Sequence, residues 1–515
     1  MRELAVHRST RRRFLAALSG TLLAAACSQR PTAPSPTALP TPAPTGTPVT
    51  VSQPTVPPGS VRSYALQARP SELVLGSYRV TTFTYDGQLP GPELRVREGE
   101  TLRVTLTNQL PEPTTIHWHG IPVPNAMDGV PEVTQPAVPP GGSFTYEFVV
   151  PVAGTYFYHT HIGLQLDRGL AGALIVEPRQ ETSSYDREVT LLLDDWLDGI
   201  DGTPEDALRR LAGAGHGPHG AMPMSPGTHA MPGMGMPGMG SQPGTAAVPV
   251  PAETEPDLVY PLYLVNGQPP ETPFEFSGKR GEVLRLRLVN AASATIFRVV
   301  LVGHRLRVVQ ADGQPVEPLE GDVLRIGMGE RYDVLVRLER PGVWPLVAWA
   351  EGTRAFGRAI LRYDGSTGAA PPTTARPREL DGELLHALRF RAASPGTARS
   401  PDVDRTVVLA GGMGQYVWTI DGRAYPDAEP IRIRLGSRVR FRIRNMTTMP
   451  HPMHLHGHFF RVGDPVVGSL RDTVLIEPMQ EVAIDWLVEN PGRWAFHCHH
   501  LYHQETGMMQ VIEIA

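Results

Sequence analysis

Gly99-Glu100-Thr101-Leu102-Arg103-Val104-Thr105-Leu106-Thr107-Asn108 is a stretch that the chain repeats twice more, as Gly281–Asn290 and Gly436–Asn445. Apolar and polar residues alternate in each copy, and this period of two predicts a β-strand with one face on a core. A turn with glycine precedes each copy, and a glycine followed by another apolar stretch closes it. Three copies of one strand-rich unit predict an all-β chain of three β-sandwiches.

The three units differ in the residues after the closing glycine. The first continues with Tyr158-His159-Thr160-His161 and the third with His497-Cys498-His499, whereas the second has Pro345-Leu346-Val347-Ala348. We therefore expect the first and third units to hold metal, and the middle unit to be a spacer that shapes the substrate side. Four histidines outside the metal-binding pattern are interpreted as structural residues: His304, His386, His458 and His500.

Ten of the eighteen histidines fall into four runs with metal-ligand spacing. The runs are His117-Trp118-His119, His159-Thr160-His161, His451-Pro452-Met453-His454-Leu455-His456, and His497-Cys498-His499 together with His503. Alternate side chains of a strand point to opposite faces, so Cys498 faces away from the two histidines beside it. One short segment can thus touch two metal centres. A thiolate, imidazoles and a weak thioether form the ligand set of a blue copper site.

The four runs, in this order, resemble the multicopper oxidase family, whose members include bacterial laccases and cuprous oxidases. The resemblance covers nearly the whole chain after residue 60, and it implies three cupredoxin-like Greek-key β-sandwich domains. It also implies four copper ions: one blue type 1 ion, one type 2 ion and a coupled type 3 pair. The implied type 1 ligands are His451, Cys498 and His503, with Met508 axial. The implied type 2 ligands are His117 and His454. The implied type 3 ligands are His119, His159 and His499 on one ion, and His161, His456 and His497 on the other.

The family's chemistry also assigns catalytic roles. Cys498 is expected to pass electrons through its flanking histidines to the three-copper cluster that the type 2 ion and the type 3 pair form. Oxygen reduction consumes protons, and Asp128 matches the family's acidic residue near the cluster, although Asp128-Gly129 equally suits a turn. Related bacterial enzymes often carry Glu directly after the last His ligand. This chain has Gln504 there, which cannot relay a proton, and Glu505 follows it as the remaining candidate.

The resemblance implies an exported oxidase that couples one-electron oxidation of phenolic or similar donors to the four-electron reduction of O₂ to water, as laccases do. Oxidation of Cu(I) for copper tolerance is the near alternative. A copper-binding or storage protein without turnover is an alternative of another class. The net charge of −5, with 47 Lys and Arg against 52 Asp and Glu, indicates no basic surface for nucleic acid. A monomer is expected.

An insertion interrupts the second unit. Thr203 is predicted to cap a short helix that begins at Pro204. Residues 213–245 are then almost entirely Gly, Pro, Met and His, a composition that cannot build a packed core. Either this is a flexible insert that happens to be rich in Met, or its thioethers deliver Cu(I). The candidates for delivery are Met222, Met224, Met231, Met234, Met236, Met239 and, just before His451, Met449. Thr447 stands where related cuprous oxidases place an Asp.

The N-terminus predicts export. Residues 1–27 resemble a twin-arginine signal, with Arg11-Arg12-Arg13 before an apolar run too short to span a membrane. Ala24-Ala25-Ala26 before Cys27 permits either a lipid-modified cysteine or ordinary cleavage. Residues 28–60 are a linker rich in Pro and Thr. The predicted domains are 61–180, 181–375 and 376–515, and the expected location is extracytoplasmic, with a lipid anchor at Cys27 as one alternative.

Overall fold

The computed structural model describes residues 59–181, 184–214, 251, 253–372 and 376–515. The predicted signal, nearly all of the linker and the Met-rich insert lie outside the described residues. The described chain is mainly β-strand, with two α-helices, α1 (Pro204–Ala214) and α2 (Leu501–Glu505). Neither of these helices has the length and apolar character that crossing a membrane requires.

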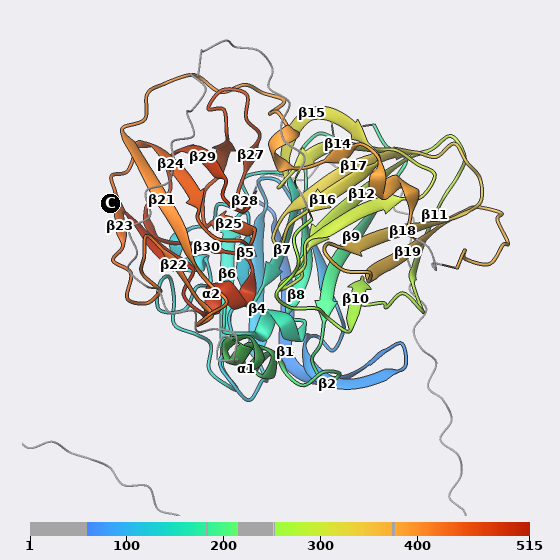
Figure 1. Cartoon of the computed structure of the whole chain (residues 1–515), viewed down its shortest axis with the longest axis horizontal. Helices are drawn as coiled ribbons and strands as arrows, with labels where there is room; N and C mark the ends of the chain where they lie inside the picture. The colour runs from blue at the N-terminus through green and yellow to red at the C-terminus, as the bar shows by residue number, and fades with distance from the viewer. Residues whose placement is uncertain (1–58, 182–183, 215–250, 252, 373–375) are drawn as a thin grey trace, which may run out of the picture. The chain divides into compact units, whose positions relative to one another are not determined.

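The first sandwich consists of two four-stranded sheets that share one core, drawn in blue to green in Figure 1. One sheet has the order β2-β1-β4-β6 and contains β1 (Val61–Leu75), β2 (Tyr78–Tyr85), β4 (Thr101–Asn108) and β6 (Ser143–Val149). The other has the order β3-β8-β7-β5 and contains β3 (Gly91–Arg97), β5 (His117–His119), β7 (Gly154–His159) and β8 (Ala171–Glu177). The 3-10 helices η1 (Asn125–Met127) and η2 (Gln165–Arg168) lie in its loops.

The second sandwich has two six-stranded sheets. The sheet β10-β9-β12-β17-β14-β15 contains β9 (Arg187–Trp196), β10 (Leu262–Val265), β12 (Val283–Asn290), β14 (Leu306–Ala311), β15 (Gln314–Gly321) and β17 (Arg331–Arg337). The sheet β11-β19-β18-β13-β16-β20 contains β11 (Phe274–Gly278), β13 (Phe297–Leu301), β16 (Val323–Ile326), β18 (Val343–Ala350), β19 (Phe356–Tyr363) and β20 (Leu384–Leu385). The chain that leaves this unit includes the 3-10 helices η3 (Arg378–Asp381) and η4 (Ala387–Arg389).

The third sandwich carries the C-terminus. The sheet β22-β21-β24-β29-β26-β27 contains β21 (Val403–Gly412), β22 (Val417–Ile420), β24 (Arg438–Asn445), β26 (Phe460–Val462), β27 (Leu470–Arg471) and β29 (Glu481–Leu487). The sheet β23-β31-β30-β25-β28 contains β23 (Ile431–Ile433), β25 (His451–Leu455), β28 (Thr473–Ile476), β30 (Gly492–Cys498) and β31 (Met509–Ile514). Because β20 pairs with β16, the segment after residue 376 first runs along the second sandwich, and the strands of the third begin only at β21.

One topology recurs in all three units, which confirms the predicted all-β fold of three sandwiches. The first strand of each unit pairs in parallel with the repeated strand, as β1 with β4, β9 with β12 and β21 with β24. The predicted glycine turns are present as well. Asp86, Asn266 and Asp421 have φ of 55°, 50° and 52°, and each precedes a glycine that also has positive φ. Two consecutive residues with positive φ form the tight turn whose twist matches a β-hairpin.

The asparagine that ends each repeated strand holds the loop beyond it. Nδ2 of Asn108 donates to the carbonyl of Glu112 at 2.9 Å, and Nδ2 of Asn445 donates to that of Met449 at 2.7 Å. Nδ2 of Asn290 makes the same kind of contact in the second unit, with the carbonyl of Thr295 at 2.9 Å. A buried irregular loop lacks strand partners for its carbonyl groups, and the side-chain amide supplies them. In the first and third units these loops lead to the histidine strands β5 and β25.

The helix predicted after Thr203 is α1. Oγ1 of Thr203 accepts a hydrogen bond from the N–H of Asp206 at 3.2 Å, and the Asp206 carboxylate accepts one from the N–H of Thr203 at 2.9 Å. This reciprocal pair satisfies two N–H groups that the first helical turn would otherwise leave free. The helix therefore begins where the sequence predicts, directly before the Met-rich insert.

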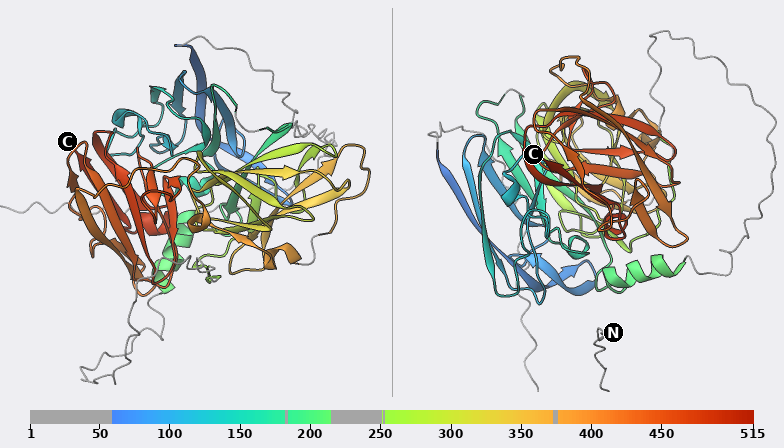
Figure 2. Two further views of the ribbon diagram at one scale, coloured as in Figure 1. Left: turned by 90° about the horizontal axis from the view of Figure 1, so that it is seen from above. Right: turned by 90° about the vertical axis from the view of Figure 1, so that its left-hand side faces the viewer.

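Each sandwich contacts the other two. Asn125 of the first unit donates to the carbonyl of Arg493 in the third at 2.7 Å. Thr155 of the first unit donates to Asp333 in the second at 2.5 Å. Arg331 of the second unit donates to Asp472 in the third at 2.7 Å. Figure 2 lets the reader follow the third unit, in orange to red, beside the other two. Residues far apart in the chain can therefore build one site.

Candidate metal centres

Three predicted ligands meet inside the third sandwich. His451 begins β25, Cys498 ends β30 and His503 lies in α2, and all three are fully buried. Sγ of Cys498 lies 3.6 Å from Nδ1 of His451 and 3.8 Å from Nδ1 of His503, and the two Nδ1 atoms are 3.1 Å apart. One thiol and two imidazoles that converge in this way fit a single soft ion such as copper.

Hydrogen bonds on the outer nitrogens determine how these two rings face the cysteine. Nε2 of His451 lies 2.8 Å from Oγ1 of Thr447, and Nε2 of His503 lies 3.2 Å from the carboxylate of Asp257. Because each Nε2 has a partner, each Nδ1 keeps a lone pair for an ion. Burial raises the pKa of the Cys498 thiol, so a thiolate here requires a cation beside it.

Met508 is fully buried next to this site. Its N–H donates to the carbonyl of His503 at 2.9 Å, and its own carbonyl accepts from the N–H of Cys498 at 3.0 Å. The main chain of Met508 is therefore hydrogen-bonded to the main chain of two ligands, Cys498 and His503. Its role as axial ligand stays a prediction, and its main-chain position is compatible with it.

Eight further histidines gather where the first and third sandwiches meet. They are His117, His119, His159 and His161 of the first unit, and His454, His456, His497 and His499 of the third. All are buried except His161, which is half-buried. Nε2 of His497 lies 3.0 Å from Nε2 of His456 and 3.4 Å from Nε2 of His161. These three rings are a triplet that the family resemblance assigns to one ion.

The other five rings each have at least one buried nitrogen without a hydrogen-bond partner. These atoms are Nε2 of His117, His159 and His454, Nδ1 of His119 and both ring nitrogens of His499. A buried polar atom without a partner costs ~1–3 kcal/mol, so gathering six of them is unfavourable unless cations bind there. Imidazole is a ligand that suits copper. The donor set therefore fits the ions that the family resemblance implies.

In four of these rings Nδ1 contacts a main-chain carbonyl. Nδ1 contacts are made by His117 with Asp128 O at 2.8 Å, His159 with Thr160 O at 2.8 Å, His454 with Asp472 O at 2.9 Å and His497 with Cys498 O at 3.0 Å. Burial, followed by the neighbouring rings, lowers the pKa of His119, His159, His161, His456, His497 and His499 well below the ordinary value. Rings that stay neutral keep the lone pair that a metal needs.

Asp128 is at once a turn residue and a neighbour of the cluster. Its carboxylate lies 3.0 Å from Nδ1 of His456, and its carbonyl holds Nδ1 of His117. Gly129 after it has φ of 83°, and a Cβ there would lie 1.8 Å from the carbonyl oxygen of Ile116. Asp128-Gly129 therefore forms a tight bend, and it also places a carboxylate beside a cluster histidine. The proton-transfer role of Asp128 stays a prediction.

Glu505, the other residue predicted to handle protons, ends α2 and is exposed as a whole residue. Its carboxylate accepts a hydrogen bond from Nε2 of Gln504 at 3.5 Å. Desolvation by the protein atoms around this carboxyl raises its pKa to about 7. Within the described chain, the side-chain hydrogen bond of Gln504 and Glu505 is with each other and not with a cluster histidine. The catalytic role of Glu505 therefore stays a prediction.

Sequence reasoning missed Asp257, which lies beside the cysteine site. This buried carboxylate accepts from Tyr416 Oη at 2.6 Å and lies 3.1 Å from Nε2 of His500 and 3.2 Å from that of His503. Burial alone would raise its pKa, but His500 and His503 hold the pKa of Asp257 well below its usual range. A single Asp in the stretch after the Met-rich insert carries no local signal for this contact.

Asp472 was missed as well. Its carboxylate lies 3.1 Å from Nε2 of His119, a histidine of another unit. The sequence does offer a signal here, since Arg471-Asp472 interrupts an otherwise apolar strand region and such charges are rarely buried without partners. No motif spacing links Asp472 to His119, which is 353 residues away.

The histidines interpreted as structural have ordinary partners in most cases. Nε2 of His304 lies 2.8 Å from Oη of Tyr363, and Nε2 of His458 accepts from the N–H of Asn490 at 3.3 Å. His500 stacks on His503 with ring centres 3.6 Å apart. His386 differs in that its buried Nε2 has no partner and the residue lines a cavity, whereas His500, whose Nδ1 is also without a partner, contacts Asp257 through Nε2.

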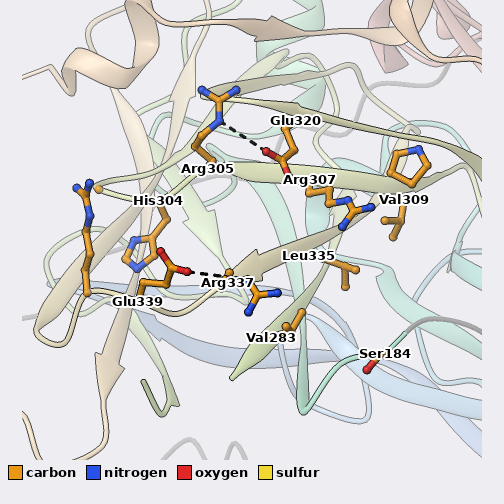
Figure 3. A pocket seen from close by; sticks show the side chains of 13 residues that line it. Ser184, Val283, His304, Arg305, Arg307, Val309, Glu320, Leu335, Arg337 and Glu339 are labelled. Carbon is orange, nitrogen blue, oxygen red and sulfur yellow. Dashed lines mark ion pairs between the residues drawn. The ribbon is translucent and has the colours of Figure 1, made fainter. Parts of the chain in front are cut away.

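Two cavities near the second and third units differ in character. A groove of about 690 Å³ on the second sandwich is lined by Arg305, Arg307 and Arg337 (Figure 3). It includes none of the candidate metal ligands. A second cavity of about 560 Å³ is mostly apolar and reaches Thr448, next to the Thr447 that contacts His451. Met449 lines a small adjoining pocket together with Asp257 and His500. The methionines of the insert lie outside the described residues.

Comparisons with known proteins agree with this architecture. Three family models described as multicopper oxidase match residues 68–181, 187–366 and 399–515. The chain is 40% identical to the multicopper oxidase MmcO of Mycobacterium tuberculosis, over 87% of this chain and 86% of the relative. It is 28% identical to a copper resistance protein A homolog of Pseudomonas syringae pv. tomato, over 84% and 89%. The crystal structure of a laccase from Botrytis aclada is similar with a TM-score of 0.70 at 26% identity, over 88% of each chain.

Proposed function

The chain belongs to the multicopper oxidase family, and from that premise we propose that it oxidises phenolic or similar one-electron donors as laccases do. As a member it is a copper-dependent oxidoreductase with O₂ as its electron acceptor. Bound copper supplies one-electron transfer at the cysteine site and the reduction of O₂ to water at the histidine cluster. The remaining question is which donor the chain's own residues admit.

We assign the type 1 ligands to His451, Cys498 and His503, with Met508 axial. The assigned type 2 ligands are His117 and His454, and the assigned type 3 ligands are the triplets His119, His159, His499 and His161, His456, His497. The convergent nitrogens of the second triplet and the unpartnered nitrogens of the other five rings support this division. Cys498 connects the type 1 site to the cluster, because it is a type 1 ligand and its neighbours in the chain, His497 and His499, each belong to one of the two type 3 triplets.

The apolar cavity beside Thr448 carries the proposal of an organic donor. Its volume of about 560 Å³ lies in the range of small-molecule sites, and Leu388, Leu475 and Met479 line it. Thr448 connects the cavity to Thr447, whose hydroxyl lies 2.8 Å from Nε2 of His451. An aromatic donor bound in this cavity would lie next to Thr448. Thr448 is bonded to Thr447, the residue that contacts the type 1 ligand His451.

Filling the cavity tests this proposal. Leu388→Trp should raise KM for a small phenol by ~10-fold or more, because an indole occupies the space of the substrate ring. Leu335→Trp is the matched control, a half-buried leucine in the groove of Figure 3. The parent should bind about four coppers, absorb strongly in the visible and consume O₂ with the phenol. One copper per chain, or an unchanged KM in Leu388→Trp, would contradict the proposal.

Oxidation of Cu(I) is the second candidate, and the methionines of the third unit favour it. Met446 and Met479 are 49% and 67% exposed, which is unusual for methionine. The N–H of Asn445 donates to the carbonyl of Gln480 at 2.9 Å, which brings their loops together. Met449 lines the pocket beside Asp257. Thioethers suit Cu(I), and one relative is named a copper resistance protein A homolog.

The two donors can be separated by replacing thioethers. In the double variant Met449→Leu/Met479→Leu, volume and apolar character are kept while both sulfur atoms are lost. If Cu(I) is a substrate, its oxidation should fall several-fold while phenol oxidation stays within about twofold. Met509→Leu, at a buried methionine of β31 that lines neither of these two cavities, is the control. Equal rates of Cu(I) oxidation in all three proteins would contradict a role of these sulfur atoms in Cu(I) oxidation, and the organic donor would remain the candidate substrate.

We also propose that the chain is exported by the twin-arginine route and acts outside the cytoplasm. The support is the sequence of residues 1–27, which lie outside the described residues. Replacing Arg11, Arg12 and Arg13 by lysine should leave the protein in the cytoplasm, as fractionation would detect. Mass spectrometry of the exported protein would distinguish a lipid on Cys27 from cleavage before or after it.

A further inference from the structure

The second sandwich provides none of the assigned copper ligands, yet one of its turns lies against the cluster. Gly329, in the turn between β16 and β17, has φ of 80°. A Cβ at Gly329 would lie 2.9 Å from the ring of His499 and 3.0 Å from that of His119. These rings belong to the third and first units. Glycine allows the turn to approach both, so the middle unit is more than the spacer that the sequence suggested.

Arg331 extends this contact to all three units. Its Nη1 donates to Oδ1 of Asp472 at 2.7 Å and its Nη2 to Oδ2 at 2.5 Å. Its Nη1 also donates to the carbonyl of Gly329 at 2.9 Å, and its Nε to that of Thr155 in the first unit at 3.3 Å. Both ions are fully buried. A two-pronged pair between a guanidinium and a carboxylate fixes orientation as well as distance.

Asp472 in turn contacts two of the assigned copper ligands. Its Oδ1 lies 3.1 Å from Nε2 of His119, and its carbonyl lies 2.9 Å from Nδ1 of His454. Oγ1 of Thr473 lies 3.1 Å from the same two nitrogens. The nitrogens that remain, Nδ1 of His119 and Nε2 of His454, have no partner. The two rings stack with centres 3.8 Å apart and planes 13° apart.

His119 needs this neighbour more than the other rings do. Its buried nitrogen without a partner is Nδ1, whereas that of His117, His159 and His454 is Nε2. A neutral imidazole that donates its Nε2–H to a carboxylate keeps the lone pair on Nδ1, so Asp472 selects the tautomer that can bind a metal. A backbone carbonyl performs that task for the other three rings.

Further charges hold the Arg331–Asp472 pair in place. Asp312 accepts from the N–H of Arg331 at 2.9 Å and from Nε of Arg471 at 3.0 Å, and Arg471 donates to Glu330 at 3.1 Å. Two guanidinium groups thus face three carboxyl groups, and all five side chains are buried. Burial alone would raise the pKa of Asp472, but Arg331 holds it well below its usual range. Removing either partner would leave a buried charge uncompensated.

We propose that the second domain is a positioning element of the trinuclear cluster, acting through the contact of Arg331 with Asp472 and of Asp472 with His119 and His454. Arg331 is a positioning residue in this scheme, because it orients the carboxylate that orients the rings. The proposal rests on the cluster assigned under the proposed function. It predicts that copper in the cluster depends on a residue of a domain that supplies no ligand.

Two variants of the complete, copper-loaded chain test this proposal. Arg331→Lys keeps the charge and loses the two-pronged contact. Asp472→Asn keeps the volume and removes the carboxylate. Both should lose cluster copper to a chelator with affinity lower by ~10–100-fold, the usual effect of removing a partner of a metal-bound histidine. The blue band of the cysteine site should persist and report an intact third unit. Copper per chain and the paramagnetic resonance signal of type 2 copper are the readouts.

The control is Asp485→Asn, which breaks the partly buried pair with Arg440 in the same unit and involves no assigned copper ligand. It should keep the parent's copper content. If Arg331→Lys and Asp472→Asn also keep it, with unchanged chelator resistance, the positioning role is overturned. It is equally overturned if both variants lose the blue band together with the cluster copper, since the pair would then hold the fold rather than the rings. Fewer than four coppers in the parent would instead refute the cluster assignment.

Discussion

The carboxylate of Asp128 lies 3.0 Å from Nδ1 of His456, and both side chains are buried where the first and third units meet. The same residue holds Nδ1 of His117 with its carbonyl oxygen. Asp128 therefore contacts one ring assigned to the type 2 ion and one assigned to the type 3 pair. Asp472 shares this arrangement, with its carboxylate on His119 of the first unit and its carbonyl on His454 of the third.

Asp128→Asn should slow reoxidation of the reduced enzyme by O₂, by ~10–100-fold. The amide keeps the size of the side chain and can still touch His456, but it cannot supply a proton to reduced oxygen. Reduction of the type 1 site by a donor should be unaffected, because Asp128 does not touch that site. Stopped-flow measurement of the two half-reactions separates these effects. Reoxidation as fast as in the parent would make Asp128 a turn residue only.

Cys498→Ser should abolish the blue absorption and the oxidase activity. The hydroxyl replaces the sulfur that lies 3.6 Å and 3.8 Å from the two histidine nitrogens, and with it the path toward the cluster. The fold should survive, because serine is smaller than cysteine and leaves only a small void. Visible absorption, activity and far-ultraviolet circular dichroism are the measurements. A persistent blue band would rule out Cys498 as the ligand.

Met508→Leu should raise the reduction potential of the type 1 site without emptying it. A weak axial thioether donates electron density to the oxidised ion, and leucine of similar volume does not. The potential is measured by redox titration of the blue band. Met509→Leu, at the neighbouring buried methionine in β31, should leave the potential unchanged. Equal potentials in parent and Met508→Leu would show that Met508 is not axial.

Deleting residues 215–240 should lower Cu(I) oxidation and leave phenol oxidation equal or faster. The deletion removes the six methionines predicted to deliver Cu(I), while α1 and residues 253–257 near the cysteine site are retained. Parallel assays with Cu(I) and a phenol provide the comparison. If both rates fall together, or if Cu(I) turnover is untouched, the insert does not deliver copper.

His458 should make the protein less stable in mild acid. Burial lowers its pKa from 6.5 to about 4, so the unfolded chain binds a proton between these pH values and the folded chain does not. This contribution is complete above about pH 6.5 and is lost as the pH falls toward 4. The shift corresponds to at most ~3 kcal/mol. His458→Gln should therefore lose less unfolding free energy than the parent between pH 7 and 4.5, as urea titrations would measure. Parallel losses in the two proteins would contradict this.

The sequence by itself determined the elements and most of the candidate ligands, because both depend on short-range backbone geometry. The alternation in Gly99–Asn108 predicts a strand whatever it packs against, and the structure places β4 there. His-x-His spacing puts two rings on one face of any strand, as in β5. Thr203 and Asp206 similarly define the start of α1 within four residues.

Only the tertiary structure decided which nitrogen each ring turns inward and which charges lie behind it. Asp257 meets His503 across 246 residues, and Arg331 meets Asp472 across 141. No local preference encodes such pairs, because they arise when the faces of different sandwiches pack together. Buried charges must then find partners wherever packing puts them. The contribution of the middle unit to the cluster therefore could not be predicted from its own sequence, which has no metal ligand after the closing glycine.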